Sequence, residues 1–316
     1  MMNIIETHNL VKRFNGAPEP AVKGVSFAVR EGEVFSLLGP NGAGKTTTIS
    51  MLSCLLQPTE GDALIGGESI VEDPMEVKKI IGVVPQEIAL YPKLSAKENL
   101  FFWGRLYGMG GKELKQRVDE VLEIVGLADR AKDRVETYSG GMKRRINIGV
   151  GLLHQPKLVY MDEPTVGIDP QSRRNILDTV MALNEQGMTV LYTTHYMEEA
   201  QELSDRIGIM DQGEMIALGT LKELTQLVGK QDIVILHITE EQSTPELVSA
   251  LEGVHGVRNV DAENGTLRLV TDDGNVALPD LITTANVRGV RVSDVSIQEP
   301  NLEAVFLHLT GRSLRN

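Results

Sequence analysis

A glycine-rich stretch near the N-terminus has the residue types that bind phosphate. It fits the pattern G-x-x-x-x-G-K-[ST] and reads Gly39-Pro40-Asn41-Gly42-Ala43-Gly44-Lys45-Thr46-Thr47. Glycines let backbone N–H groups approach phosphate oxygens because no Cβ blocks the way. The Lys45 side chain can then reach the β- and γ-phosphates of a nucleotide, and the Thr46 hydroxyl can ligate Mg²⁺. The alternative is an ordinary turn before a helix.

Two adjacent acids end an apolar segment far downstream. Residues 157–161 read as a strand, and Asp162 and Glu163 follow it directly. A carboxylate at the end of a strand beside the phosphate loop can hold Mg²⁺ through water, and we assign this role to Asp162. Glu163 can orient or deprotonate the attacking water. Without the phosphate loop upstream, a strand followed by a polar turn would explain the pattern equally well.

Two more polar residues follow apolar runs. His195 comes after residues 189–194 and could hydrogen-bond a γ-phosphate, while Gln86 comes after residues 80–85 and could complete the Mg²⁺ shell with its amide oxygen. Each residue, taken alone, is more often structural. Their functional interpretation becomes stronger because the phosphate loop and the two acids belong to the same chain.

A second anion site is predicted at Ser139-Gly140-Gly141. Ser139 is a good N-cap, and the two glycines leave N–H groups open at the start of a helix that runs toward His154. One nucleotide does not need two separate phosphate-binding sites in one protomer. We therefore expect a head-to-tail homodimer, in which each nucleotide lies between the loop of one chain and the Ser139 helix of the other.

Several elements must position these residues. Strand Val34–Leu38 precedes the loop and a helix over 46–56 follows it, which is the order that the loop pattern needs. The other expected elements of residues 1–220 are strands over 4–12 and 25–29, helices over 95–107 and 112–125, a helix from Pro170 ending before Gly187, and a hairpin that turns at Gln212-Gly213.

The remaining residues, 221–316, read as a second domain. The expected order is a strand at 233–238, a helix capped by Thr244, strands at 257–261 and 266–271, a helix at 278–285 and a strand at 290–297. This βαββαβ order favours a small ferredoxin-like α+β domain. A last helix carries an apolar stripe of Leu302, Val305, Phe306 and Leu309.

Composition excludes several classes of protein. The net charge of −13 argues against broad non-specific DNA binding but leaves room for a local basic patch. Lys143-Arg144-Arg145 is such a patch, and the simpler interpretation is a solvated helix face. The single cysteine, Cys54, allows no internal disulfide and is expected to lie buried and inert on the helix after the loop. The six scattered histidines show no transition-metal spacing. No apolar run reaches membrane-spanning length and no signal peptide is evident, so we expect a cytosolic protein.

The order of motifs resembles the nucleotide-binding subunit of ATP-binding cassette (ABC) proteins over residues 1 to about 220. The resemblance implies a P-loop NTPase fold of α/β class, with an antiparallel β subdomain and a helical subdomain at about 88–155. It also implies the cofactors ATP and Mg²⁺. In that family Gln86 would be the Q-loop, Ser139-Gly140-Gly141 the signature, Asp169 part of the D-loop and His195 the switch histidine. Glu163, His195 and Lys45 would then be the catalytic residues.

Some positions depart from the family pattern. Phe14 stands where the family usually has an adenine-stacking aromatic residue, often Tyr, and could also be a strand core residue. Tyr138 and Met142 replace the usual Leu and Gln of the signature. The serine and glycines remain, so contact with the γ-phosphate should survive while polar contact with the ribose is in doubt.

The C-terminal stretch, residues 299–312, looks like the tail of the ABC-2-type exporter group that includes daunorubicin/doxorubicin resistance ATP-binding subunits. This resemblance implies an ATPase on the cytoplasmic face of the cell membrane that powers export through a separate integral membrane permease. The exported substrate would be a drug, lipid, polysaccharide or ion. The C-terminal domain would support dimerisation or regulation.

Two alternatives remain open. An importer ATPase can also carry a small α/β regulatory domain at its C-terminus. A soluble cassette ATPase acting on ribosomes or DNA belongs to another class, but this chain has one cassette and no heptad run between its motifs. No nucleic-acid partner is expected.

Overall fold

The computed structural model describes residues 2–227, 232–298 and 301–311. It divides into two compact units, of which the first extends to Leu218 and the second begins at Gly219. Residues 299, 300 and 312 of the tail that resembles exporter subunits lie outside the described residues.

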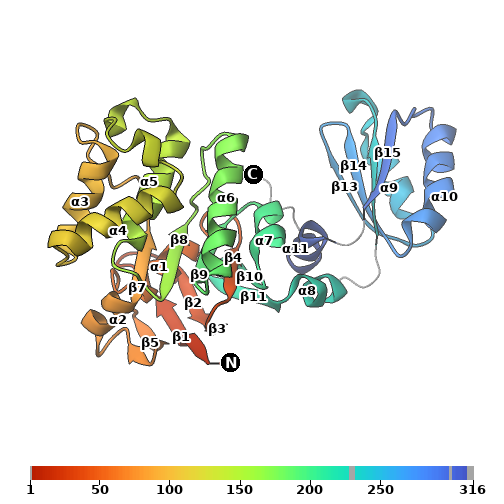
Figure 1. Cartoon of the computed structure of the whole chain (residues 1–316). Coiled ribbons are helices and arrows are strands. Elements are labelled where there is room, and N and C mark those ends of the chain that lie inside the picture. Colours follow the sequence, from red (N-terminus) through yellow and green to blue (C-terminus); the bar gives the residue numbers. More distant parts are fainter. Residues whose placement is uncertain (1, 228–231, 299–300, 312–316) are drawn as a thin grey trace. The chain divides into compact units, whose positions relative to one another are not determined.

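A six-stranded sheet forms the centre of the first unit (Figure 1). Its order is β11-β10-β4-β9-β8-β7, and the pairs from β10 to β7 are parallel. The strands are β4 (Val34–Leu38), β7 (Ile81–Val84), β8 (Leu158–Asp162), β9 (Thr189–Thr194), β10 (Arg206–Asp211) and β11 (Glu214–Gly219). Every residue of β4, β8 and β9 is buried, as expected for parallel strands covered on both faces.

Two apolar cores cover the faces of this sheet. Val159 and Met161 of β8 belong to one core cluster, and Leu158 and Tyr160 belong to the other. Alternate residues of a strand point to opposite faces, so one continuous apolar run supplies both cores. The same run ends in the two acids, which are thereby held at the edge of a rigid sheet.

A second, antiparallel sheet also lies in the first unit. Its order is β2-β1-β5-β6, with β3 paired to β1. The strands are β1 (Asn3–Lys12), β2 (Val22–Val25), β3 (Ala28–Arg30), β5 (Glu60–Ile65) and β6 (Glu68–Ser69). The single strand predicted at 25–29 is wrong, because the chain breaks at Ser26 and Phe27. There the Thr7 hydroxyl donates to the Phe27 carbonyl and accepts from the Phe27 N–H, and the Thr7 N–H also donates to the Phe27 carbonyl.

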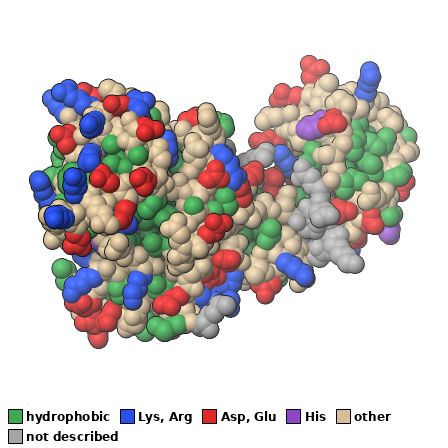
Figure 2. Space-filling model, viewed as in Figure 1, with side chains coloured by type: hydrophobic (Ala, Val, Ile, Leu, Met, Phe, Trp, Pro, Cys, Tyr) green, Lys and Arg blue, Asp and Glu red, His purple; other side chains and the backbone are tan. Residues whose placement is uncertain are grey.

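Helices complete the first unit. They are α1 (Lys45–Leu52), α2 (Pro74–Ile80), α3 (Ala96–Leu106), α4 (Gly111–Ile124), α5 (Gly140–Leu152), α6 (Pro170–Glu185) and α7 (Met197–Leu203). Helices α3, α4 and α5, orange to yellow-green in Figure 1, pack on one another as a helical subdomain. On the face shown in Figure 2, acidic and basic side chains are mixed over this unit.

The helix after the phosphate loop is shorter than predicted. It ends at Leu52 instead of residue 56, and Cys54 lies beyond it in a left-handed conformation, with φ of 55°. The thiol is only partly buried, so the expectation of a buried cysteine on this helix is wrong. Burial nevertheless raises the pKa of the Cys54 thiol, which keeps it protonated and unreactive at neutral pH.

The second unit has the βαββαβ order that the sequence predicts. Its elements are β12 (Asp232–His237), α9 (Pro245–Glu252), β13 (Val257–Glu263), β14 (Thr266–Thr271), α10 (Gly274–Val287) and β15 (Asp294–Gln298), flanked by α8 (Leu221–Leu227) and α11 (Leu302–Thr310). The sheet order is β13-β14-β12-β15 and all pairs are antiparallel. This is the ferredoxin-like topology.

Two predictions in the second unit need correction. The last strand begins at Asp294 and not at Val290, whose side chain packs in the core below the sheet. In α11, Leu309 is exposed and Leu307 is buried, so the buried side is broader than the predicted stripe and shifted from it. Within the described residues, no helix has the length and apolar character needed to cross a membrane.

Candidate functional site

The glycine-rich loop connects β4 to α1 and depends on two glycines. Gly44 has φ of 100°, a left-handed conformation that favours glycine, and it caps the helix that begins at Lys45. A Cβ on Gly39 would lie 2.2 Å from the carbonyl oxygen of Met210, at the end of β10. The loop therefore lies against the neighbouring strand, and its backbone is held where the sheet ends.

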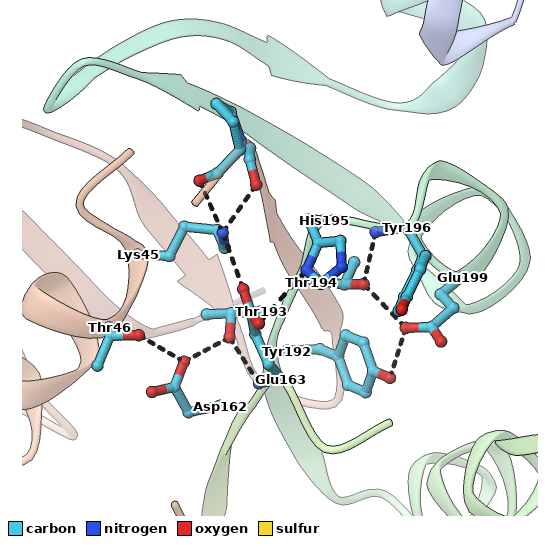
Figure 3. Close-up of polar contacts among 12 residues, drawn as sticks. Lys45, Thr46, Asp162, Glu163, Tyr192, Thr193, Thr194, His195, Tyr196 and Glu199 are labelled. Carbon is cyan, nitrogen blue, oxygen red and sulfur yellow. Dashed lines mark hydrogen bonds and ion pairs between the residues drawn. The ribbon is translucent and has the colours of Figure 1, made fainter. Parts of the chain in front are cut away.

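The ammonium group of Lys45 is buried at the centre of the site. Its Nζ donates to the carbonyl oxygens of Gly39 (2.7 Å) and Pro40 (3.1 Å) and forms an ion pair with Glu163 Oε1 at 3.0 Å. The other carboxylate oxygen, Glu163 Oε2, lies 3.3 Å from His195 Nδ1 (Figure 3). Lysine, glutamate and histidine thus converge from the start of α1 and from the ends of β8 and β9.

Asp162 lies beside this group and is fixed by two hydroxyls. It accepts hydrogen bonds from Thr193 Oγ1 (2.7 Å) and Thr46 Oγ1 (3.2 Å) (Figure 3). The parallel register of β8 and β9 places Asp162 opposite Thr193. Burial raises the pKa of the Asp162 carboxyl, and the hydrogen bonds from the two threonines oppose that rise.

Glu163 has an unusual backbone for its residue type. Its φ is 45°, in the left-handed region that non-glycine residues rarely adopt. The Glu163 N–H donates to Thr193 Oγ1 at 2.9 Å, which holds the turn in place. The left-handed residue turns the chain sharply at the end of β8 and aims two successive carboxylates into one site.

A cavity of about 490 Å³ opens over these side chains. Residues 41–47 of the loop line it together with Gln86, Glu163 and His195, all of which the sequence singles out. Ala21 and Val166 also line it, although no sequence pattern points to them. The cavity has the size of a small-molecule site, and cationic and N–H groups face it beside a carboxylate.

The segment after Gln86 is attached to the helix that starts at Ser139. The Asn147 amide of α5 donates to the carbonyl oxygens of Pro85 (3.2 Å) and Glu87 (3.4 Å) and accepts from the Ala89 N–H (3.1 Å). The sequence contained no clear sign of this connection.

Arg144 adds a further contact between the same elements. It is buried and donates to the Pro85 carbonyl at 2.9 Å, and its burial lowers the pKa of the guanidinium. Arg145 donates to the carbonyl oxygens of Val125 and Gly126. The prediction that residues 143–145 form a solvated face is therefore wrong for both arginines, which bind backbone carbonyls.

Other predicted residues lie outside the cavity lining. Phe14 is 42% exposed, and the Lys12 ammonium lies 5.6 Å from its ring centroid. The Ser139 hydroxyl accepts from the Met142 N–H, so Ser139 is the predicted N-cap of α5. Ser139 and Gly140 are both exposed, and their helix end is accessible to a second molecule.

Residues of β9 and α7 that sequence reasoning missed support the site. Thr193 forms hydrogen bonds with both acids, as described above. The two sequence neighbours of Thr193, Tyr192 and Thr194, donate hydrogen bonds to the Glu199 carboxylate. The paired threonines directly before His195 were the available sequence signal. Nothing local distinguished Glu199 from the other acids of its helix.

Comparisons with known proteins agree with this geometry. Residues 22–166 match the family described as ABC transporter, and residues 219–310 match the family described as ATP-binding protein DrrA1-3-like, C-terminal domain. The linearmycin resistance ATP-binding protein LnrL of Bacillus subtilis (strain 168) is 49% identical over 315 residues, covering 99% of this chain and 100% of that protein. The daunorubicin resistance ATP-binding protein DrrA3 of Streptomyces coeruleorubidus is 38% identical, covering 93% and 92%.

Solved structures resemble the first unit. The dimeric ATP-binding cassette MJ0796, in a post-hydrolysis state bound to ADP and Pi, has a TM-score of 0.62 and 31% identity, covering 68% of this chain and 98% of that chain. The structure of cbiO1 from Clostridium perfringens, part of the ABC transporter complex cbiONQ, has a TM-score of 0.65 and 26% identity, covering 72% and 95%.

Proposed function

Because the chain belongs to the ATP-binding subunits of ABC transporters, we propose that two copies of it close on Mg²⁺-ATP and power export through a separate membrane permease. The chain is an ATPase of the drug-resistance and export type, as its relatives indicate. The observation that carries the proposal is the meeting of Lys45, Glu163 and His195 at one cavity lined by the phosphate loop.

Binding of ATP would use the backbone N–H groups of the loop and the Lys45 ammonium, which together neutralise phosphate charge. Phe14 would stack on the adenine. Hydroxyl, carboxylate and amide oxygens are the donors that Mg²⁺ prefers, and the contact between Thr46 and Asp162 fits such a site. Thr46, Asp162 and Gln86 would hold the ion, which supplies charge neutralisation at the phosphates.

Glu163 would act on the attacking water. Its carboxylate is held between Lys45 and His195, so its position is defined before a substrate binds. The carboxylate would orient the water and take its proton as the bond from the water oxygen to the γ-phosphorus forms and the bond from that phosphorus to the β–γ bridging oxygen breaks, with ADP as the leaving group. His195 would hydrogen-bond the γ-phosphate and respond to its loss.

The second copy would complete the site. The N-terminus of α5, where Ser139 and Gly140 are exposed and the buried Gly141 follows, would offer N–H groups that suit the γ-phosphate bound by the partner. Hydrolysis would remove this shared ligand and reopen the dimer. Asn147 and Arg144 connect the Gln86 segment to the same helix, so opening would move the segment that we expect to contact the permease on the cytoplasmic face.

The names of the relatives indicate a class of exported substrate. LnrL is named for resistance to linearmycin and DrrA3 for resistance to daunorubicin, and both are ATP-binding proteins of this length. We propose that this chain likewise serves resistance to a drug by powering its export. The second unit would support dimerisation or regulation.

The test uses Glu163→Gln, which removes the base and keeps the size of the side chain. ATP turnover should fall roughly 10²–10⁴-fold while nucleotide still binds. With ATP and Mg²⁺, light scattering should show a dimer of the variant, and the additional change Ser139→Arg should return it to monomer. Unchanged turnover in Glu163→Gln would remove the assigned role of the carboxylate.

A pull-down identifies the partner. The tagged Glu163→Gln protein is captured from detergent-solubilised membranes with ATP and Mg²⁺, and co-purified chains are identified by mass spectrometry. A multi-helix membrane protein at near-equal stoichiometry supports the export proposal. Ribosomal or DNA-repair proteins without a membrane chain would contradict it and leave the nucleotide chemistry.

A further inference from the structure

A buried carboxylate on α7 has no part in the mechanism above. Glu199 lies four residues after His195 and is 2% exposed. A buried carboxylate is costly unless it is paired and hydrogen-bonded, so its contacts show what holds it in place. Figure 3 shows it on the side of His195 away from Lys45.

The first set of contacts fixes the chain on both sides of His195. Glu199 Oε2 accepts from Tyr192 Oη (2.9 Å) and from Thr194 Oγ1 (2.9 Å). The Thr194 oxygen in turn accepts from the Tyr196 N–H at 2.9 Å. One carboxylate oxygen therefore fixes the residue before His195 directly and the residue after it through a single hydroxyl (Figure 3).

The second set of contacts connects the same carboxylate to α6. Glu199 Oε1 lies 3.6 Å from Arg173 Nε. The Arg173 guanidinium also lies 4.4 Å from the centroid of the Tyr196 ring, and that ring lies 4.2 Å from the His195 ring. Arg173 thus contacts Glu199 of α7 by charge and Tyr196, the residue after His195, by stacking.

The same turn of α6 contacts the signature glycines. A Cβ on Gly141 would lie 2.2 Å from Ser172 Oγ, so α5 approaches α6 closely at that point. Ser172 also donates its N–H to the Asp169 carboxylate at the start of α6. Adjacent residues of one helical turn therefore contact the predicted signature on one side and Glu199 on the other.

We infer that Glu199 is a positioning residue for His195, and that Arg173 connects this position to the first turn of α6. The inference rests on the proposed role of His195 in hydrolysis. Glu199 holds the imidazole so that Nδ1 stays beside Glu163. Through Arg173, a displacement of the first turn of α6 is passed to His195 and from there to the catalytic carboxylate.

Glu199→Gln separates this inference from a purely structural role. The amide oxygen can still accept from Tyr192 and Thr194, while the charge facing Arg173 is lost. The variant should fold, and its ATP turnover should fall roughly 3- to 30-fold while KM for ATP changes little. Glu198→Gln is the matched control, because its neighbouring carboxylate is exposed, and it should leave turnover unchanged.

A double-mutant cycle with His195→Ala gives the decisive measurement. If Glu199 acts through His195, Glu199→Gln should cause no further loss of turnover in the His195→Ala background. Equal losses in both backgrounds would overturn the inference, as would full activity of Glu199→Gln. If His195→Ala itself keeps full turnover, the proposed role of the histidine fails instead, and that result is distinct.

Variants of Arg173 provide an independent test of the inference. Arg173→Met removes the charge and the planar group, and it should reproduce the loss seen in Glu199→Gln without adding to it in the double variant. Arg173→Lys keeps the charge but not the stacking on Tyr196, so partial recovery is expected. An unaltered turnover of Arg173→Met would show that Glu199 acts without α6.

Discussion

A single hydroxyl sets the spacing of the two neighbouring acids. Thr193 Oγ1 donates to Asp162 and accepts from the Glu163 N–H, and it is fully buried. Its bonds cross from β9 to β8, so the sheet fixes the carboxylates through one side chain. A residue that touches no nucleotide in our proposal can therefore still control turnover.

Thr193→Val tests this control at the residue scale. Valine has the same shape but leaves the Glu163 N–H without its acceptor, at a cost of about 1–3 kcal/mol in unfolding free energy. Turnover should fall about 10- to 100-fold because the carboxylates lose their orientation. Steady-state kinetics and urea unfolding measure both effects. Thr193→Ser keeps the hydroxyl and should stay close to wild type, and equal loss in both variants would refute the explanation.

At the scale of elements, α5 holds the segment that follows Gln86. Asn147→Leu removes three hydrogen bonds to residues 85–89, and within the described residues only the Pro85 carbonyl keeps a second donor, Arg144. We expect faster amide exchange at Ala89, a less stable protein and weaker coupling of ATP turnover to the partner. Hydrogen exchange with mass spectrometry checks the first expectation. Unchanged protection of residues 85–89 would show that Asn147 does not hold them.

The end of α5 carries a titratable contact with β7. His154 Nε2 lies 2.9 Å from the Ile81 carbonyl oxygen, and the ring stacks on Tyr107 at 4.2 Å between centroids. Burial lowers the pKa of His154 below its ordinary value of 6.5. The folded state thus favours the neutral ring, which contributes stability above pH 6.5 that is lost as the pH falls through the lowered pKa.

His154→Gln removes this pH dependence. Glutamine can still donate to Ile81 but does not titrate. Urea unfolding at a series of pH values between 7.5 and 5 should show that the wild type loses more stability on acidification than the variant. Parallel pH profiles for the two proteins would contradict the assignment.

Local patterns predicted the elements that begin and end at strong signals. The loop glycines, the Ser139 cap, Pro170 and the turn at Gln212-Gly213 all lie where their residue types indicate. The predictions were wrong where contacts with residues distant in the sequence determine the local structure. Thr7 interrupts the predicted strand at Phe27, and the carbonyls of Pro85 and Val125 attract arginines that looked solvated.

The site was predicted only as a set of residues. Lys45, the adjacent pair Asp162 and Glu163, and His195 lie far apart in the sequence, and each lies at the end of a strand or at the start of a helix. Parallel pairing brings them together, but the order β10-β4-β9-β8 cannot be read from local periodicity. The supporting residues Thr193 and Glu199 lack any motif, since their importance comes from contacts alone.

At the scale of the whole molecule, two units have separate cores. Leu281 of α10 is fully buried in the core of the second unit, together with residues of its sheet. Leu281→Ala should lower the unfolding free energy of that unit by about 2–5 kcal/mol. Basal ATP turnover should be unchanged, because the residues that we propose as catalytic lie in the first unit.

Calorimetry measures this independence. Two transitions are expected, and Leu281→Ala should move only one of them to lower temperature. Val276→Ala on the same helix is the control, because Val276 is 71% exposed and should move neither. A shared shift of both transitions would show that the units unfold as one.

The position of β4 in the sheet also affects how the protein is made. Both neighbours of this apolar strand, β9 and β10, come from residues 189–211, more than 150 residues after it. At about 5–20 residues per second, a ribosome needs roughly 8–30 s to supply them. During that time β4 has two unpaired apolar edges in the nascent chain, and the phosphate loop lacks the strands that flank β4. Newly made chains should therefore require a chaperone and should acquire nucleotide only after residue 211 has emerged.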